Sequence, residues 1–514
     1  MNFRLIFDTV RHLKFTQVYH QLRHRLYHPR FKPCVSPIEK PEVKLSKCID
    51  AYSCQKGNSF EFLNIHDTFT SWNMTEHGML WAYNLNYMDW LGQRNMTQEE
   101  GEKWIDAFIK DIEDHYIGLD AAPTALRSIN WMKYFVFHPM AAKKERLDSL
   151  YSQICLLERK LEYHLLGNHL LEDAYALFFA SVFFRDYSLF QKASVLLREQ
   201  LKEQILADGA HYEQSPMYHC ILLGRLLDCY NISVNNSVFE EQDALNRELK
   251  QIAESMLGHL VAIVYQDGTI PLLNDSARGI APTTTELLDY AQRLQLAPQL
   301  MPLHECGYRK MQQGPMEAIV DVGNITATYQ PGHSHADTFN YELHIDGQPV
   351  IVDTGISTYD KSLRRQYERS TKAHNTVCVD EKDSSQVWGG FRVGKRAHVK
   401  IDTDEPFSIS AVHDGFGTKC LHSRRFSLNK DGFHVEDCLS SEALAVSYIH
   451  LAPSIKAIVL DNNRISIGKH VIIVDGVDKI NIVRDRISTS YNCFEDIDVI
   501  ELHFHNQLAY TIQE

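Results

Sequence analysis

Residues 333–355 read HSHADTFNYELHIDGQPVIVDTG. Within this stretch apolar and polar residues alternate, and Asp346-Gly347 stands where a tight turn would reverse the chain. The same period of two begins near residue 308 and continues in short runs such as FSISAVHDG and RISIGKHVIIVDGV. We therefore predict an antiparallel β-sandwich domain over residues 306–514.

The residues before this region follow a helical period. Apolar residues recur at three- and four-residue spacing in seven segments: 98–117, 124–138, 142–166, 168–184, 187–207, 216–232 and 237–265. Many helices of similar length with short connections indicate either an α-solenoid or a closed α/α toroid. We assign residues 61–305 to this helical domain, place the hinge at 295–307, and treat residues 1–60 as an N-terminal helical or extended segment.

Length and charge bound the possible functions. A chain of 514 residues exceeds one ordinary hydrophobic core, so two large domains are expected. The formal net charge of −14 argues against a nucleic-acid partner, since phosphate binding needs a basic surface. An acidic enzyme can still bind an acidic polymer if its cleft is locally basic.

The cysteines and the N-terminus bear on location. The 11 cysteines are scattered without a CxxC pair, which indicates free thiols in a reducing compartment. The N-terminus has basic residues but no continuous apolar run typical of a secretion signal, and no stretch is long enough to span a bilayer. We therefore expect a cytoplasmic protein.

An amphipathic helix is expected near the N-terminus. Its apolar residues recur at helical spacing, with arginines and histidines between them: Phe15, Val18, Tyr19, Leu22 and Leu26. Such a helix either docks on the protein or makes peripheral contact with a membrane surface.

Two segments at predicted helix starts are rich in polar and titratable residues. In GNHLLE (167–172), Asn168 can cap the helix or serve in a site, and His169 and Glu172 share one helix face. In DGAHYEQSPMYH (208–219), Pro216 suits a first helical turn, while Tyr218 is either a packing residue or a functional one.

The histidines of HSHAD (333–337) allow two interpretations. His333 and His335 are separated by one residue, so an extended backbone places both imidazoles on one side. With Asp353 and His374 nearby in a folded sheet, His335 could join a two-histidine, one-carboxylate metal site, for which zinc is suited. Hydrogen-bonded histidines without a metal are the alternative.

A fourth group has the residue types that bind sugars. Aromatic rings stack on sugar faces, and arginine pairs with carboxylates. The candidates in WAYNLNY (81–87) and PTALRSINW (123–131) are Tyr83, Asn84, Arg127, Asn130 and Trp131. A packed helix with a snorkelling arginine explains the same pattern. Walker, dinucleotide-binding, GxSxG and HExxH motifs are missing from the sequence.

Four segments occur in a fixed order: GNHLLED, DGAHYEQSPMYH, HSHADTFNYELHIDGQPVIVDTG and RSTKAHNTVCVD. Together they resemble the heparinase II/III family of polysaccharide lyases, which is itself similar to alginate lyases built from an α/α toroid and a β-sandwich. The resemblance covers nearly the whole chain and implies this two-domain fold. The N-terminal helix resembles that of family members associated with surface-polysaccharide gene clusters, which implies a bacterial protein and leaves the substrate open.

The resemblance also implies roles for single residues. Asn168 and His169 match the pair that binds the uronate carboxylate, Tyr218 the catalytic acid, and His333 the histidine supplied by the sandwich. His335, Asp353 and His374 match residues that hold a structural zinc. Glu172 falls where relatives place a glutamate near the cleavage site, and Tyr367 where some place a second tyrosine.

The expected reaction is β-elimination at a uronic acid in an acidic polysaccharide, giving a C4=C5 unsaturated product. Asn168 and His169, with help from Arg127, would neutralise the substrate carboxylate as charge develops. Either Tyr218 or His333 would remove the C5 proton, and Tyr218 would protonate the C4 oxygen. If Tyr218 is the base, His333 or His219 would assist its deprotonation.

Two alternatives compete with the lyase. One is a non-catalytic glycan-binding factor in surface-polysaccharide assembly. The other is a glycoside hydrolase, for which Glu172, Glu213 and Asp275 offer carboxylates but no evident pair. The sandwich edges could mediate a homodimer, although no residue pattern indicates one.

Overall fold

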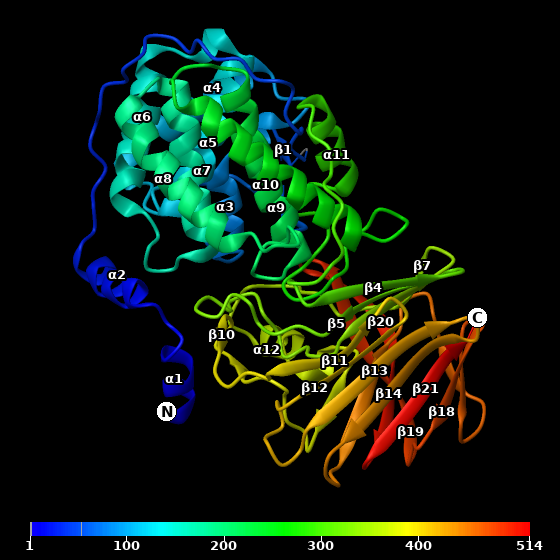
Figure 1. The fold of residues 1–514 in the computed structure, drawn as a ribbon. Coiled ribbons are helices and arrows are strands. Elements are labelled where there is room, and N and C mark those ends of the chain that lie inside the picture. The colour runs from blue at the N-terminus through cyan, green and yellow to red at the C-terminus, as the bar shows by residue number, and fades with distance from the viewer. Residues whose placement is uncertain (1–2, 53, 514) are drawn as a thin grey trace.

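The computed structural model describes residues 3–52 and 54–513. A helical domain packs on one end of a β-sandwich, and the N-terminal segment runs along the outside of the helices (Figure 1). The predicted fold class, a helical toroid followed by an antiparallel sandwich, is confirmed.

Within the described residues, nine α-helices form the helical domain. They are α3 (Met79–Tyr87), α4 (Gln98–Ile109), α5 (Ala121–Phe137), α6 (Lys144–Lys160), α7 (Gly167–Phe184), α8 (Tyr187–Gln204), α9 (Pro216–Val234), α10 (Gln242–Ile263) and α11 (Thr284–Arg293). Each of the seven predicted helical segments overlaps one of them. The short helices α3 and α11 were not predicted, because nine or ten residues give too few turns for a clear period.

A small sheet precedes these helices and was also missed. Its strands β1 (Gln55–Lys56), β2 (Ser59–Phe62) and β3 (Ile65–Thr68) are antiparallel neighbours. Phe60 and Phe62 of β2 are buried in the helical core, so this sheet closes the domain on one side. Strands this short leave little alternation for sequence analysis to detect.

Helices α7 and α9 carry the site residues. Helix α7 packs against α5, α8 and α9, and nearly all of its residues are buried. Helix α9 begins at Pro216, with the Ser215 side chain accepting a hydrogen bond from the backbone N–H of Tyr218. This cap fixes the first turn of α9 and therefore the position of Tyr218.

The sandwich consists of one eight-stranded and two four-stranded antiparallel sheets. The eight-stranded sheet runs in the order β11 (Val399–Glu405), β12 (Ser408–His413), β13 (His422–Asn429), β14 (Gly432–Leu439), β21 (Gln507–Gln513), β18 (His470–Asp475), β17 (Arg464–Ile467), β16 (Ala457–Val459). The four-stranded sheets are β19 (Lys479–Ser490), β20 (Cys493–Phe504), β15 (Ala445–His450), β8 (Val377–Val379), and β4 (Tyr308–Gln313), β5 (Met316–Asp321), β6 (Tyr341–Ile345), β7 (Gln348–Ile351). Apolar residues of all three sheets share one core.

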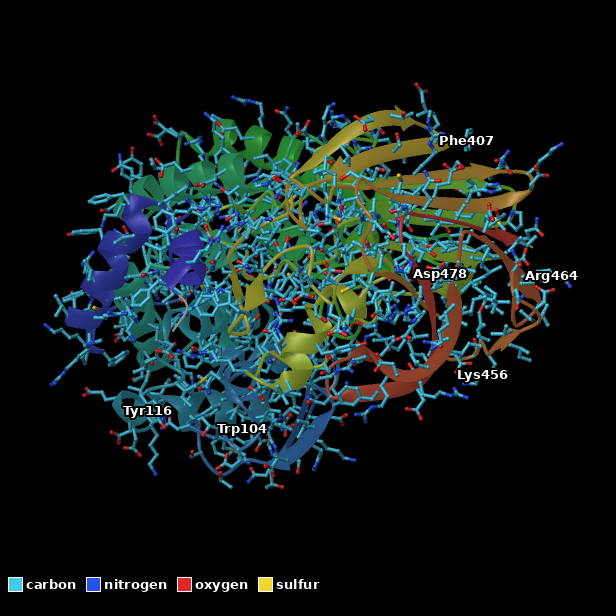
Figure 2. All side chains as sticks on the ribbon, turned by 90° about the horizontal axis from the view of Figure 1, so that it is seen from below. Trp104, Tyr116, Phe407, Lys456, Arg464 and Asp478 are labelled. Carbon is cyan, nitrogen blue, oxygen red and sulfur yellow. The ribbon has the colours of Figure 1, made fainter. Side chains whose placement is uncertain are left out.

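The predicted turn at Asp346-Gly347 is confirmed. Ile345 of β6 pairs with Gln348 of β7, and both turn residues have positive φ, as this two-residue hairpin requires. Other sandwich loops carry exposed side chains, labelled in Figure 2 at Phe407, Lys456 and Asp478, and exposed Arg464 begins strand β17. The side of the sandwich that meets the helices holds the long β5–β6 connection with His333 and His335.

The helical and sandwich domains are joined by buried polar contacts. Tyr265, after α10, donates a hydrogen bond to Glu342 of β6 at 2.9 Å. Gln214, before α9, donates to the backbone oxygens of Cys306 and Asn324 at 2.8 and 2.9 Å. These contacts fix the segment before α9 against the sandwich.

The N-terminal amphipathic helix forms as predicted. Helix α1 (Phe3–Val10) and helix α2 (Phe15–Leu26) lie on the outside of the molecule (Figure 1). Helix α2 contacts the protein through polar residues, and its apolar residues face outward. Among the described helices, none has both the length and the apolar character needed to cross a bilayer.

Candidate active site

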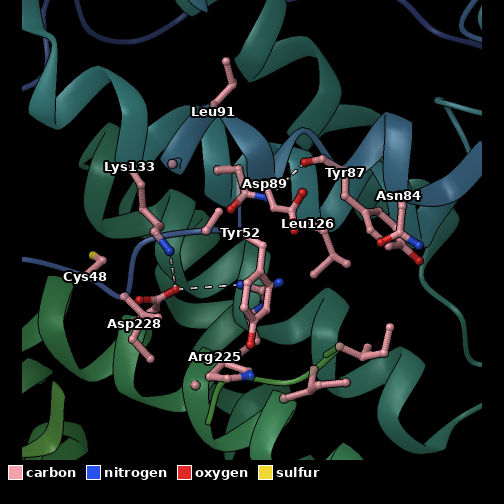
Figure 3. A pocket seen from close by; sticks show the side chains of 18 of the residues that line it. Cys48, Tyr52, Asn84, Tyr87, Asp89, Leu91, Leu126, Lys133, Arg225 and Asp228 are labelled. Atoms are coloured by element: carbon pink, nitrogen blue, oxygen red, sulfur yellow. Dashed lines mark hydrogen bonds and ion pairs between the residues drawn. The ribbon is translucent and has the colours of Figure 1, made fainter. Parts of the chain in front are cut away.

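A cavity of about 640 Å³ opens where the helical domain meets the sandwich. Helices α3, α5, α7 and α9 supply about half of the lining, as Figure 3 shows for Asn84, Leu126 and Arg225. Residues 47–52 and the segment after α3 also line the cavity, and the sandwich contributes Tyr359 and Tyr491. Asn168, His169 and Tyr218 belong to the wall. Segments far apart in the sequence therefore contribute to one hollow of a size typical of ligand sites.

Three of the four predicted catalytic residues are in direct contact. The Asn168 side-chain amide donates to His333 Nε2 and to Glu213 Oε2, both at 3.2 Å. The rings of Tyr218 and His333 lie 4.0 Å apart between centroids. Asn168 is not the N-cap of α7, a role held by Leu166, so its side chain is free to make these contacts.

Asp275 fixes the orientation of His333. The carboxylate lies 2.8 Å from His333 Nδ1 and 2.7 Å from His335 Nε2, and Arg365 donates to both of its oxygens. Although burial favours the neutral acid, Arg365 and the two histidines hold the pKa of Asp275 well below its usual range. An ionised Asp275 accepts the Nδ1 hydrogen of His333, which leaves the Nε2 lone pair directed toward Asn168.

Tyr218 is held as a neutral phenol. Burial raises the pKa of Tyr218 above its ordinary value. The hydroxyl group of Tyr359 donates a hydrogen bond to the Tyr218 oxygen at 3.1 Å. The Tyr218 hydrogen therefore remains available to a group in the cavity, as a proton donor requires.

His169 carries positive charge more readily than an ordinary histidine. Its Nδ1 lies 3.2 Å from Glu162 Oε2. Burial opposes protonation, but Glu162 and the more distant Glu213 and Glu172 raise the pKa of His169. A cationic ring beside Asn168 suits the binding of a carboxylate.

The predicted substrate-binding residues divide into two groups. Asn84, Asn130 and Glu172 line the cavity. The others have partners elsewhere among the described residues: Tyr83 with Asp120, Arg127 with Gln153 and the Asn86 carbonyl, Trp131 with Met88, and His219 with the Met256 carbonyl.

The structural contacts of Arg127 and Tyr367 explain why these two side chains lie outside the cavity. Arg127 is completely buried, packs on the Phe108 ring of α4 and donates to Gln153 of α6 and the Asn86 carbonyl of α3, so it braces α5 against these helices instead of facing substrate. Helix α5 also packs against η1 (Asp89–Gly92). Tyr367, on α12 (Leu363–Glu368), donates to Asp485 of β19. We therefore give neither residue a role in substrate binding.

Four site residues were not assigned to this cluster from the sequence. Asp275, Glu213, Tyr359 and Arg365 each contact Asn168, His333 or Tyr218 directly or through one partner. Glu213 and Asp275 were noted only as hydrolase candidates. The segment between Asp353 and His374 is dense in arginine and tyrosine, and this density was the available signal for Tyr359 and Arg365.

The expected metal ligands are close to one another in pairs. His374 Nδ1 lies 2.8 Å from Asp353 Oδ2, and the rings of His335 and His374 are 5.2 Å apart. His335 Nδ1 and His374 Nε2 are buried without a hydrogen-bond partner. These two nitrogens and the Asp353 carboxylate are donors of the kind that zinc binds.

A different set of residues satisfies a stricter geometric condition. Among the described residues, the three side chains whose ligand atoms all lie within 4.8 Å of one another are Asp208, His259 and Cys306. All three are buried, and His259 Nδ1 has no hydrogen-bond partner. This group could hold a metal ion and was not predicted from the sequence.

Comparison with known families agrees with the geometry. The model described as "Heparinase II/III N-terminus" matches residues 142–299, and "Heparinase II/III-like, C-terminal" matches residues 296–508. The chain belongs to the heparinase II/III family. The two matches together run through most of the helical domain and nearly all of the sandwich.

Curated relatives in this family are heparin-sulfate lyases. The chain is 26% identical to that of Pedobacter heparinus over 245 residues, which cover 42% of this chain and 36% of the relative. It is 23% identical to that of Bacteroides thetaiotaomicron over 319 residues, which cover 53% of this chain and 44% of the relative. The matched regions thus span less than half of either relative.

Solved structures share the fold of this heparinase II/III member. A heparinase III structure aligns over 96% of this chain and 89% of its own, with a TM-score of 0.68 and 15% identity. The heparan sulfate lyase of Pedobacter heparinus aligns over 97% and 88%, with a TM-score of 0.59 and 16% identity. At these identities the likeness establishes the fold alone.

Proposed function

We propose that this protein is a polysaccharide lyase that cleaves uronic-acid-containing glycans by β-elimination. The observation that carries the proposal is the contact of Asn168 and Tyr218 with His333, whose Nδ1 is bound by Asp275. These residues supply a base, an acid and a carboxylate ligand beside one cavity. Family membership and the heparin-sulfate lyase relatives support the same reaction class.

His333 is the better base of the two candidates. The Asp275 carboxylate selects the tautomer with hydrogen on Nδ1, so Nε2 can accept the C5 proton. The developing imidazolium is stabilised by the same carboxylate. Tyr218 is less suited to this step because burial raises its pKa and favours the protonated phenol.

Tyr218 then acts as the acid. Its hydroxyl group transfers a proton to the C4 oxygen as the C4–O bond breaks and the C4=C5 double bond forms. The hydrogen bond donated by Tyr359 stabilises the phenolate oxygen that results. The products are an unsaturated uronate and a sugar with a free hydroxyl group.

Asn168 and His169 neutralise the substrate carboxylate. Removal of the C5 proton moves negative charge into that carboxylate, so donors that bind it stabilise the transition state more than the ground state. The Asn168 amide would exchange its hydrogen bonds to Glu213 and His333 for one to the substrate. The raised pKa of His169 supplies a cation beside it.

The decisive test follows the unsaturated product. Purified protein is incubated with heparan sulfate, hyaluronan, chondroitin and alginate, and ultraviolet absorbance is recorded for wild type and Tyr218→Phe. We expect absorbance to rise with wild type and the variant to lose about 10²–10⁴-fold in kcat, the usual worth of an acid–base group. A variant that retains full activity and its fold would contradict the assignment.

The rival functions have distinct signatures in the same assay. A hydrolase yields saturated fragments by mass spectrometry, because water is added across the broken bond. A binding factor yields no fragments but still binds oligosaccharide. The hydrogen-bonded set of Asn168, His333 and Asp275 favours the lyase, since binding alone needs no oriented base.

We also propose that His335, Asp353 and His374 hold a structural zinc ion. The two unpartnered ring nitrogens and the carboxylate give a suitable donor set. A bound ion would supply rigidity, tying the loop of His333 to strands of the sandwich. Its removal by chelation should lower Tm and activity together, whereas a fully active metal-free protein would exclude it.

Cobalt substitution separates this site from the second group. Only the Asp208–His259–Cys306 group includes a thiol, so a cobalt–thiolate charge-transfer band would locate the ion there. Cobalt bound without that band, and lost in His374→Ala, would place the ion at His335, Asp353 and His374.

We further propose a reducing compartment such as the cytoplasm, because all 11 cysteines are free.

A further inference from the structure

Part of the cavity wall contains polar atoms without hydrogen-bond partners. They are Glu172 Oε2 on α7, Arg225 Nε on α9 and Asp89 Oδ1 at the start of η1, all inaccessible to solvent. Arg225 lies two helical turns beyond Tyr218 on α9, and all three side chains line the same cavity. Asp89 and Arg225 are labelled in Figure 3. We name Asp89, Glu172, Arg225 and their neighbours Lys133 and Asp228 the distal subsite.

The central pair of the distal subsite is too widely spaced for a hydrogen bond. Arg225 Nε and Glu172 Oε2 are 3.7 Å apart, and Arg225 Nη1 is 3.9 Å from Asp228 Oδ2. The side chains of Arg225 and Glu172 are 21% and 14% exposed, so a small rotation of either would let a sugar hydroxyl accept from Arg225 and donate to Glu172. Buried polar atoms left without partners cost free energy, so a ligand that satisfies them is stabilised there.

Each lysine and arginine side chain that lines the cavity lies within ion-pair distance of a carboxylate. Lys47 and Arg94 contact Asp50, Lys133 contacts Asp228 at 2.8 Å, and Arg225 faces Glu172. In the described part of the chain the lining holds these four lysine and arginine residues and five carboxylates: Asp50, Asp89, Glu172, Asp228 and Glu286. His138 and His169 also line the cavity, and His169 is the cation assigned to the uronate carboxylate. The locally basic cleft that a highly sulfated polymer would need is therefore not found in this lining.

We propose that the distal subsite binds an uncharged, hydroxyl-bearing sugar unit adjacent to the uronate and excludes sulfated ones. The inference rests on the proposed lyase function and narrows its substrate to unsulfated uronate glycans. A sulfate group at this position would face Asp89, Glu172 and Asp228 with no unpaired cation to bind it, which is unfavourable. A hydroxyl group meets both an acceptor and a donor.

The ionisation of the two carboxyls fits this ligand. Burial raises the pKa of Glu172 to about 7 and also raises the pKa of Asp89. Near neutral pH a fraction of Glu172 is therefore protonated and can donate as well as accept. Neutral polyols suit such a mixture, whereas anions do not.

The experiment compares polymers that differ only in sulfation. Unsulfated chondroitin is paired with chondroitin sulfate, and heparin with its chemically desulfated and N-acetylated form. We expect kcat/KM to be at least about tenfold higher for the unsulfated member of the pair that is cleaved. Glu172→Gln should narrow this ratio, while Glu158→Gln, the same change in an exposed pair with Lys192, should leave it unchanged.

Binding to the Tyr218→Phe variant is measured in parallel with oligosaccharides of both kinds. Preferential binding of the unsulfated member supports the distal subsite even if no polymer is cleaved, in which case only the lyase proposal fails. Equal or tighter binding of the sulfated member, or a ratio that Glu172→Gln does not alter, would overturn the distal-subsite proposal.

A second, independent observation concerns α1 and α2, whose apolar residues are exposed. Phe15 is 84% and Leu26 86% exposed, and Phe3, Phe7 and Leu22 also face solvent. The docked face of α2 is polar: Gln17, 2% exposed, donates to the carbonyls of Leu165 and Tyr329. His20 and His24 stack on Tyr163 and His164. The helix is thus anchored by polar contacts, with its apolar face outward.

The charge of this segment is opposite to that of the whole protein. Residues 3–32 contain five arginines and two lysines but one acidic residue, Asp8, whereas the full chain has a formal charge of −14. Basic residues beside an exposed apolar helical face are typical of helices that lie on anionic lipid surfaces. An acidic protein with one basic, apolar edge would approach such a surface with that edge first.

We infer that the outward face of α1 and α2 binds an anionic membrane surface. The apolar side chains would enter the boundary between headgroups and acyl chains, and the arginines would contact the headgroups. The inference does not depend on the proposed reaction, because these helices lie outside the cavity lining.

Sedimentation with vesicles tests this surface. The full chain should bind vesicles of phosphatidylglycerol and phosphatidylcholine, bind pure phosphatidylcholine much less, and dissociate at high salt. Leu22→Ser with Leu26→Ser should weaken binding at least about tenfold, since each leucine contributes apolar burial. The matched control, Leu300→Ser with Leu444→Ser, changes two exposed leucines elsewhere and should bind like wild type.

Absence of binding to anionic vesicles by wild type would overturn the membrane proposal. So would a double variant that binds normally. Sedimentation velocity without lipid tests whether the same face pairs with a second copy of the chain. If it does, wild type is a dimer and the α2 double variant is a monomer, and this result would overturn the membrane proposal for this face.

Discussion

The two ends of the cavity are built on opposite plans. Around His333 the polar groups bind one another: Asp275 meets His333, His335 and Arg365, and Asn168 meets His333 and Glu213. In the distal subsite Asp89, Glu172 and Arg225 each retain an atom without a partner. The first arrangement is ordered before substrate arrives, and the second is completed by substrate.

This difference separates chemistry from recognition. A base must be held in one tautomer and one orientation, so its partners are supplied by the protein. A subsite gains affinity by offering polar atoms that the correct sugar satisfies. Substitutions at the first end should therefore affect stability and kcat, and those at the second should affect KM and substrate choice.

Asp275→Asn should have the largest effect on stability and activity. It leaves the buried guanidinium of Arg365 without its ionic partner and removes the acceptor that orients His333. We expect the free energy of unfolding to fall by about 3–5 kcal/mol and kcat to fall with it, measured by urea denaturation and product absorbance. Asp404→Asn removes a more exposed partner of Arg309 and should cost less than about 1 kcal/mol; equal losses in the two variants would contradict the expectation.

His169 should control the alkaline side of the pH profile. Its pKa is raised in the folded protein, so the charged ring is fully present below the ordinary value of about 6.5 and is lost as pH rises through the raised value. We expect kcat/KM to fall over that range because the substrate carboxylate loses its cation. In His169→Gln this limb of the profile should disappear, and a limb that persists would assign it to another group.

Tyr359→Phe should have a moderate effect on the chemical step alone. The variant removes one hydrogen bond to the Tyr218 oxygen and retains the ring. A bond worth about 0.5–1.5 kcal/mol corresponds to a loss of roughly twofold to tenfold in kcat, with KM nearly unchanged. A change confined to KM would show that Tyr359 acts in binding instead.

Arg225→Met should lower stability far less than Asp275→Asn. Its contacts at 3.7 and 3.9 Å are not hydrogen bonds, and Glu172, whose pKa is already about 7, can protonate when the cation is removed. We expect a change in unfolding free energy of about 1 kcal/mol together with a several-fold rise in KM. A destabilisation as large as that of Asp275→Asn would erase the distinction between the two ends.

The sequence predicted several residues of the site correctly, but it did not predict which side chains they contact. Asn168, Tyr218 and His333 were identified because they stand in motifs whose order is shared with a family. Arg127 and Tyr367 were misplaced because a pattern of residue types does not tell a buried structural group from one that faces a cavity. The charge of the cavity lining was equally hidden, since Lys133, Asp228 and Arg225 look ordinary on α5 and α9.

Local order determined the architecture of this protein. The change from helical period to alternation near residue 308 and the Asp346-Gly347 turn act between neighbours in the chain, so sequence alone fixes them. The tertiary structure alone decided that Asp275 would meet His333, 58 residues away, and Arg365, 90 residues away. Such long-range contacts depend on how helices and sheets pack, and no periodicity in the sequence records that.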